Sequence, residues 1–240
     1  MFRSNNLKLL SNKDLWNDII KRLISPNRQI LSEVLLPRLA LTSILPTSAT
    51  KPFSKVINEI HAAEIASWID NKSVIYSKTN NPYEFKLLLR GSRDGFTKDS
   101  FWNICNKQAN VIVVMKVKGT DEILGGYNPI GWEKPSSDMI VKYCNNSFIF
   151  SLKNSIIRTS ILCNAKEPEY AIECNREYGP IFGHKPCSLV MRDYFNEDEM
   201  CCWYYQSEYE QGLMYNEASF FSVDEYEIFQ ISKRSQKFNR

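Results

Sequence analysis

The sequence predicts an α+β fold that is mainly β: a two-sheet antiparallel β-sandwich flanked by helices, with a helical appendage at the N-terminus. The hydrophobic period changes from that of helices to that of strands from Val74 onward. The strand-like runs are short, and they do not alternate regularly with helices, which makes a parallel doubly wound sheet a poor fit. With 43% hydrophobic residues among 240, the chain can bury a sizeable core.

The first expected element is a helix near the N-terminus. Ser11 can cap it, with Asp14 three residues later, and Ser25-Pro26-Asn27 ends it. Six apolar residues share one face at helical spacing: Leu15, Trp16, Ile19, Ile20, Leu23 and Ile24. The first 50 residues offer little else to bury this stripe, so we expect it either to dock on the main domain or to belong to a longer helical region.

A change in composition over residues 44–52, with two prolines and small hydroxyl residues, predicts a linker. A second helix is expected from about Ser54 to Ile69, with an apolar arc that includes Trp68. His61 lies at the edge of that arc, where we interpret it as a hydrogen-bonded boundary residue. The predicted domains are a helical segment and linker at 1–52, a main domain at 53–232 and a basic tail at 233–240.

The main domain is expected to begin with strands. In the run from Glu84 to Gly91 the residues Phe85, Leu87 and Leu89 would share one face. Gly91 to Gly95 forms a turn, and Thr97 caps a short helix behind it. Further strands are expected at residues 74–77, 111–117, 123–127, 147–152, 170–172, 188–191, 202–205 and 226–231. Gly125-Gly126 lies inside one of them, where close backbone packing or a bulge would explain it.

Composition and charge limit the classes of function. The net charge is only +3 and no long basic stripe occurs, so we expect no nucleic-acid partner. No apolar run approaches the roughly 20 residues that cross a bilayer, so no membrane insertion is expected. Seven scattered cysteines fit reduced thiols, and hence a cytoplasmic protein, better than a disulfide framework.

Catalytic and metal-binding constellations are weak. Ser92 sits on a tight turn, but its surroundings lack the Gly-x-Ser-x-Gly spacing of a nucleophile elbow. His184 and Cys187, with Cys201-Cys202 downstream, lack the paired spacing of a zinc site, and buried free cysteine is commoner. We therefore expect no cofactor and no enzymatic activity, while a redox-active thiol remains open.

The turn itself carries the best candidate for an interaction surface. Arg90 and Arg93 flank it and suit recognition of a carboxylate or an acidic partner surface, although surface salt bridges would equally explain them. Asp94 is expected to cap the turn by accepting backbone N–H bonds. The candidate surface comprises Arg90, Ser92, Arg93, Asp94 and, from a separate loop, His184.

Four segments resemble signatures of the TLDc domain family: Phe85–Phe101, Val111–Trp132, Asn146–Leu152 and Phe221–Ile231. In the last, Glu227-Ile228 is similar to the family's Glu-aliphatic pair, while Phe229 stands where many members have Trp. The loop from Phe182 to Cys187 departs from a glycine-rich stretch found in many members, so the surface built there is expected to differ.

The resemblance implies a β-sandwich and no established catalytic chemistry. It implies a non-catalytic protein-interaction domain linked to oxidative-stress protection or to the vacuolar proton pump, with a pump subunit or another cytosolic protein as the partner. The N-terminal segment is similar to the part that joins BTB and BACK modules to a TLDc domain in a fungal group, and no BTB module is present. Two alternatives stay open: an adaptor fragment of a BTB/BACK-TLDc protein, and a thiol-dependent enzyme of peroxide defence. The oligomeric state stays open too.

Overall fold

The computed structural model describes residues 52–152, 160–184, 189–197, 199–204, 209 and 218–234. The expected N-terminal helix with Trp16, the linker up to residue 51 and residues 235–240 of the tail lie outside these ranges, as does Cys187. Within them, no helix combines the length and the apolarity needed to cross a membrane.

Two antiparallel sheets of six strands each dominate the described residues, which confirms the predicted mainly β sandwich. Sheet A has the order β1-β12-β2-β3-β5-β6, and sheet B has the order β11-β10-β9-β8-β7-β4. The strands of sheet A are β1 (Tyr83–Arg90), β2 (Val111–Val117), β3 (Ile123–Asn128), β5 (Phe148–Leu152), β6 (Ile161–Asn164) and β12 (Val223–Lys233). Those of sheet B are β4 (Met139–Lys142), β7 (Ile172–Asn175), β8 (Ile181–Phe182), β9 (Leu189–Met191), β10 (Cys201–Tyr204) and β11 (Ala218–Phe221).

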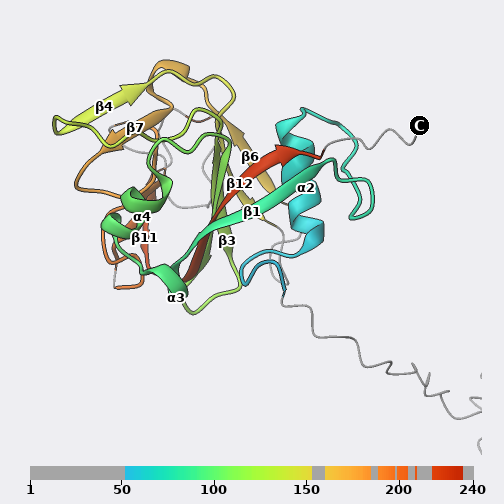
Figure 1. The fold of residues 1–240 in the computed structure, drawn as a ribbon, viewed down its shortest axis with the longest axis horizontal. Helices are drawn as coiled ribbons and strands as arrows, with labels where there is room; N and C mark the ends of the chain where they lie inside the picture. The colour runs from blue at the N-terminus through green and yellow to red at the C-terminus, as the bar shows by residue number, and fades with distance from the viewer. Residues whose placement is uncertain are drawn as a thin grey trace, which may run out of the picture. The chain divides into compact units, whose positions relative to one another are not determined.

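Three α-helices and one 3₁₀ turn flank the sheets within the described ranges: α2 (Glu59–Ile69), α3 (Gly91–Asp94), α4 (Lys98–Cys105) and η1 (Pro168–Tyr170). In Figure 1, α2 lies on one side of sheet A while the strands of sheet B lie on the other. Helix α4 begins behind Thr97, whose hydroxyl accepts from the N–H of Ser100, as the sequence predicted.

Apolar side chains fill both sides of sheet A because its central strands are buried on both faces. The inner cluster joins the two sheets and includes Trp132, whose ring meets those of Phe101 and Phe182 edge-on. The outer cluster packs α2 against sheet A. Gly126 is needed between the sheets, since a Cβ there would come within 2.5 Å of the Phe182 ring. The expected close packing of this glycine strand is therefore confirmed.

Two predicted elements were wrong, and the strand expected at residues 170–172 was misplaced, because η1 ends at Tyr170 and β7 begins at Ile172. The second helix begins at Glu59 and not at Ser54, because Asn58 accepts from the N–H groups of Ile60 and His61 and caps the helix there. Residues 52–58 run instead as a non-helical segment, here named the strap. Residues 74–77 form no strand, because Tyr76 is held to α2: its N–H donates to Ser67 and its hydroxyl to Asp70.

The predicted faces of β1 were also partly wrong. Phe85 and Leu87 pack in the outer cluster, whereas Leu89 packs in the inner one. The pairing of β1 with β12 shifts register between Leu87 and Leu89, so Leu88 is an extra residue on this strand. Such a β-bulge reverses the alternation, and a period of two read from the sequence does not show it.

Candidate functional site

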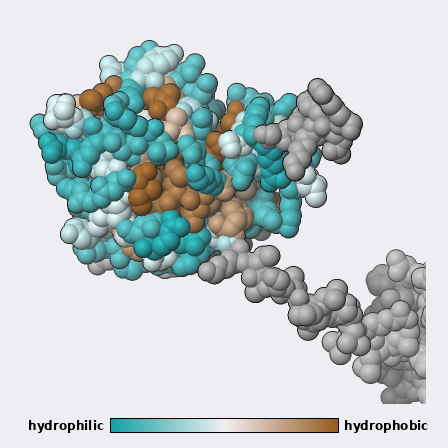
Figure 2. Space-filling view, in the orientation of Figure 1, coloured by the Kyte–Doolittle hydropathy of each residue, from teal (hydrophilic) through white to brown (hydrophobic). Residues whose placement is uncertain are grey.

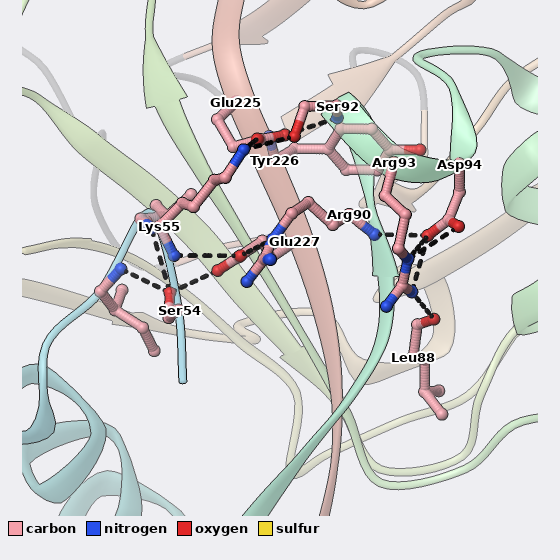
Figure 3. A network of polar contacts seen from close by, with 12 residues as sticks. Ser54, Lys55, Leu88, Arg90, Ser92, Arg93, Asp94, Glu225, Tyr226 and Glu227 are labelled. Carbon is pink, nitrogen blue, oxygen red and sulfur yellow. Dashed lines mark hydrogen bonds and ion pairs between the residues drawn. The ribbon is translucent and has the colours of Figure 1, made fainter. Parts of the chain in front are cut away.

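The turn after β1 brings four of the five candidate residues into one polar network, which Figure 3 shows from close by. Strand β1 ends at Arg90, and Ser92, Arg93 and Asp94 belong to the single helical turn α3. Gly95 ends α3 with a φ of 103°, a conformation that glycine adopts without strain.

A buried carboxylate forms the centre of the network. Glu227, on β12, has no solvent-exposed side-chain surface. Its Oε1 accepts from the Arg90 Nε at 2.5 Å and from the backbone N–H of Lys55 at 3.1 Å. Its other oxygen accepts from the hydroxyl of Ser54. A permanent cation and two neutral donors thus offset the cost of removing this charge from water.

The hydrogen bonds of Ser54 also fix the position of the strap. The Ser54 hydroxyl, besides donating to Glu227, accepts from the N–H groups of Val56 and Ile57 at 3.0 and 2.9 Å. Val56 and Ile57 are buried in the outer cluster. One serine therefore fixes the direction in which the chain approaches α2.

A second carboxylate on β12 holds the base of the turn. Glu225 accepts from the N–H of Ser92 at 2.9 Å, and its other oxygen lies 3.6 Å from the ammonium of Lys55. That ammonium also donates to the Ser92 hydroxyl at 2.8 Å. The Ser92 hydroxyl has a lysine beside it and no imidazole among its hydrogen-bond partners.

Arg93 and Asp94 form an ion pair that folds back on β1. Two nitrogens of the Arg93 guanidinium donate to Asp94, and the terminal one also donates to the carbonyl of Leu88 at 2.7 Å. Asp94 accepts from the N–H of Arg90 at 2.9 Å, which confirms its predicted role in capping the turn. The hydrogen bond from Arg93 outweighs burial and holds the pKa of the Asp94 carboxyl below its usual value.

His184 lies elsewhere, beside sheet B. Its Nδ1 is 2.8 Å from the Glu173 Oε2, and its ring stacks on Tyr170 with centroids 5.9 Å apart. The structure therefore does not bring His184 together with the other four candidates. The side chains of Ser54, Lys55, Glu225 and Glu227 complete the network, although they were not among the predicted site residues.

The chemistry open to these groups is limited. No cluster of three or more His, Cys, Asp or Glu side chains in the described ranges could hold a metal ion. The six described cysteines are buried. Burial raises the pKa of Cys105 to about 12 and also raises the pKa values of Cys144, Cys174 and Cys201. A network of paired charges at a turn can, by contrast, hold exposed side chains in a fixed arrangement.

Comparison with known proteins gives the family. No curated protein matches the chain. The family model of the TLDc domain matches residues 51–232, which is most of the 240 residues and takes in the strap, the turn and both sheets. The chain belongs to the TLDc domain family.

Proposed function

We propose that this TLDc domain is a protein-interaction module that presents a surface to a partner and catalyses no reaction. The observation that supports this most directly is the turn Gly91–Gly95. Two carboxylates of β12 anchor it through Arg90 and Ser92, yet the side chains of Ser92 and Arg93 are exposed. A surface that is rigid before binding loses little conformational entropy when a partner docks.

The thiol-dependent enzyme is less well supported. A catalytic or redox-sensing thiol needs solvent access and a lowered pKa, since the thiolate is the reactive form. The described cysteines are buried, and each one with a resolved shift has a raised pKa. Likewise, Ser92 bonds to Lys55 and not to a histidine that could act as its base.

The resemblance to the TLDc family suggests the partner. We propose that the domain binds the cytosolic part of the vacuolar proton pump, and that its contribution to oxidative-stress protection acts through this assembly. The domain would then work in the cytoplasm. The adaptor alternative, in which the helix with Trp16 docks a partner, concerns residues outside the described ranges, and truncation at residue 52 would test it separately.

A sedimentation experiment tests the proposal. The full chain is mixed with membranes that carry the vacuolar pump, at physiological salt, and the bound fraction is measured after centrifugation. We expect saturable binding that Ser92→Arg weakens by about tenfold, the loss that roughly 1.4 kcal/mol produces. Ser137→Arg is the matched control, because Ser137 is also an exposed serine and lies outside the network. Equal binding to membranes without the pump would contradict the proposal.

A further inference from the structure

Strand β1 forms one edge of sheet A, and β12 is its hydrogen-bonded neighbour in the described ranges. The N–H of Arg234 donates to the carbonyl of Pro82 at 2.8 Å, which places Pro82 in a hydrogen-bonded pair with β12. Backbone groups alternate in direction along an antiparallel strand. Tyr83, Phe85 and Leu87 therefore direct their N–H and C=O groups away from β12, toward the open edge.

Contacts within the domain close the start of this edge. The N–H of Tyr83 donates to the side chain of Asn81 at 2.9 Å. The carbonyl of Tyr83 accepts from the Arg234 Nε at 3.2 Å. Both edge-facing groups of Tyr83 are thus satisfied before any partner arrives.

The turn closes the other end. The guanidinium of Arg93 donates to the carbonyl of Leu88, and Asp94 accepts from the N–H of Arg90. The ion pair of Arg93 and Asp94 occupies the place that the backbone of a further strand would take. This is how a protein keeps an edge strand from pairing along its whole length.

The middle of the edge stays open. Phe85 and Leu87 contribute one N–H and one C=O each, and none of these four groups has a partner outside the β12 ladder in the described residues. Two residues that face outward at alternate positions are what one short extended segment needs to make four backbone hydrogen bonds.

A pocket lies beside the open stretch. It has a volume of about 370 Å³ and is lined by Phe53, Glu59, Ala62, Lys78, Asn81, Tyr83, Glu84, Phe85 and Arg234. Phe53 and Tyr83 therefore contribute to an aromatic wall together with Phe85, where an apolar side chain of an added strand would fit. Figure 2 shows that apolar surface also gathers over β1 and beside α4 on this face.

The charges beside the open stretch determine which charged residues an added strand should carry. Glu84 and Lys86 are exposed and flank Phe85, and neither forms an ion pair with a described residue. Residues that face each other across an antiparallel pair interact, and opposite charges stabilise the pair. An added strand would therefore place a basic residue opposite Glu84 and an acidic residue opposite Lys86.

We propose that the middle of β1 binds an extended segment of a partner protein as an added antiparallel strand. The segment carries apolar residues opposite Phe85 and Leu87 and an acidic then a basic residue, two positions apart, on its other face. The inference rests on the proposed function, which it deepens by naming the docking edge and the chemistry of the partner.

A second copy of this chain fits the edge less well. Self-pairing centred on Lys86 would use the groups of Phe85 and Leu87, but it would set the two Lys86 ammonium groups opposite each other, and like charges destabilise such a pair. Self-pairing centred on Phe85 would match Glu84 with Lys86 of the other copy, but it would also set Leu87 opposite Tyr83. The edge-facing groups of Tyr83 are already bonded to Asn81 and Arg234, so such a dimer would retain only the hydrogen bonds of the central pair.

The test uses a synthetic probe and the ¹⁵N-labelled full chain. The probe is the capped hexapeptide Thr-Val-Glu-Val-Lys-Thr, and the control is its charge-swapped form Thr-Val-Lys-Val-Glu-Thr. At millimolar peptide we expect the probe to shift the amide resonances of Phe85 and Leu87 and to slow their hydrogen exchange. The double variant Glu84→Lys/Lys86→Glu should prefer the swapped peptide by about fivefold, since two cross-strand charge pairs are reversed.

Three results would overturn the proposal: slow exchange of both amides in the free protein, no response to either peptide, or a dimer of the free chain that Lys86→Glu dissociates. The outcome separates this inference from the proposed function. If Ser92→Arg weakens pump binding but neither peptide binds, the domain is an interaction module and β1 is not its docking edge. If the peptide binds but the pump does not, β1 is a docking edge and the pump is not the partner.

Discussion

Two buried glutamates, Glu227 in sheet A and Glu173 in sheet B, are each bonded to a basic side chain, but the two basic side chains differ. Glu227 has a fully buried side chain that binds the guanidinium of Arg90 at 2.5 Å. Glu173 has a side chain only 4% exposed, and it lies 2.8 Å from His184 and 3.2 Å from the amide of Asn175. Arginine is always charged, whereas histidine is charged only when protonated.

The two sites also differ in what they connect. The contacts of Glu227 reach Arg90, 137 positions away, and Ser54, 173 positions away. Glu173 and His184 are only eleven positions apart. Glu227 therefore joins the strap and β1 to β12, while Glu173 orders one local part of sheet B. The first carboxylate therefore supports the fold around the turn, and the second does not.

The largest effect is expected from Arg90→Met. The variant leaves the Glu227 carboxylate buried without its cation, a change that costs about 3–5 kcal/mol of unfolding free energy. Urea unfolding followed by fluorescence measures it. Arg176→Met is the control, because the Arg176 side chain is 49% exposed beside Glu177 and such pairs contribute less than about 1 kcal/mol. Equal losses in both variants would show that Glu227 does not depend on Arg90.

A middle-sized effect is expected from Ser54→Ala. The variant removes the hydroxyl that donates to Glu227 and leaves the N–H groups of Val56 and Ile57 without an acceptor. We expect a loss of about 1–3 kcal/mol. Hydrogen exchange should also accelerate at Val56 and Ile57 before α2 opens, whereas Ser137→Ala should change neither measurement. Unchanged exchange at these two amides would show that the Ser54 hydroxyl does not hold the strap in place.

A smaller effect is expected from His184→Phe. The new ring can keep its stacking on Tyr170 but cannot bond to Glu173. Asn175 still donates to this carboxylate, so we expect a loss of only about 1 kcal/mol. Adding Glu173→Gln should recover part of it, since the amide carries no charge. A loss as large as that of Arg90→Met would show that the two glutamates depend equally on their basic partners.

Local patterns predicted most of the sandwich from the sequence. The buried strand β2, the phenylalanines of β5 on one face and the Thr97 cap all follow from residues close together in the chain. The bulge at Leu88 does not, because it arises from the register with β12, a strand more than 130 residues away. The helix start at Asn58 was hidden for a different reason: Ser54 also accepts from the N–H groups two and three residues later, as a cap does, yet the helix begins only behind Asn58.

In the candidate site, too, residues close together in the chain were predictable and their distant partners were not. Arg90, Ser92, Arg93 and Asp94 could be predicted because they are polar residues clustered around two glycines. Their partners Glu225 and Glu227 alternate along β12 on one face, but nothing in the sequence shows which strand they face. One signal was available: an acidic residue at every second position of an otherwise apolar strand needs a buried partner.

The smallest effect is expected from Asp94→Asn, which tests the exposed end of the network. The Arg93 guanidinium lowers the pKa of Asp94, so the carboxylate stabilises the fold above its unfolded pKa and loses this effect as the pH falls through the lower, folded value. The Arg93 side chain is 50% exposed, so we expect a difference of about 0.5–1 kcal/mol between wild type and variant at neutral pH. The difference should shrink toward zero in strongly acidic urea titrations, while the exposed Asp138→Asn should show none at either pH. A difference that is the same at both pH values would mean that Asp94 acts by capping Arg90 and not through its charge.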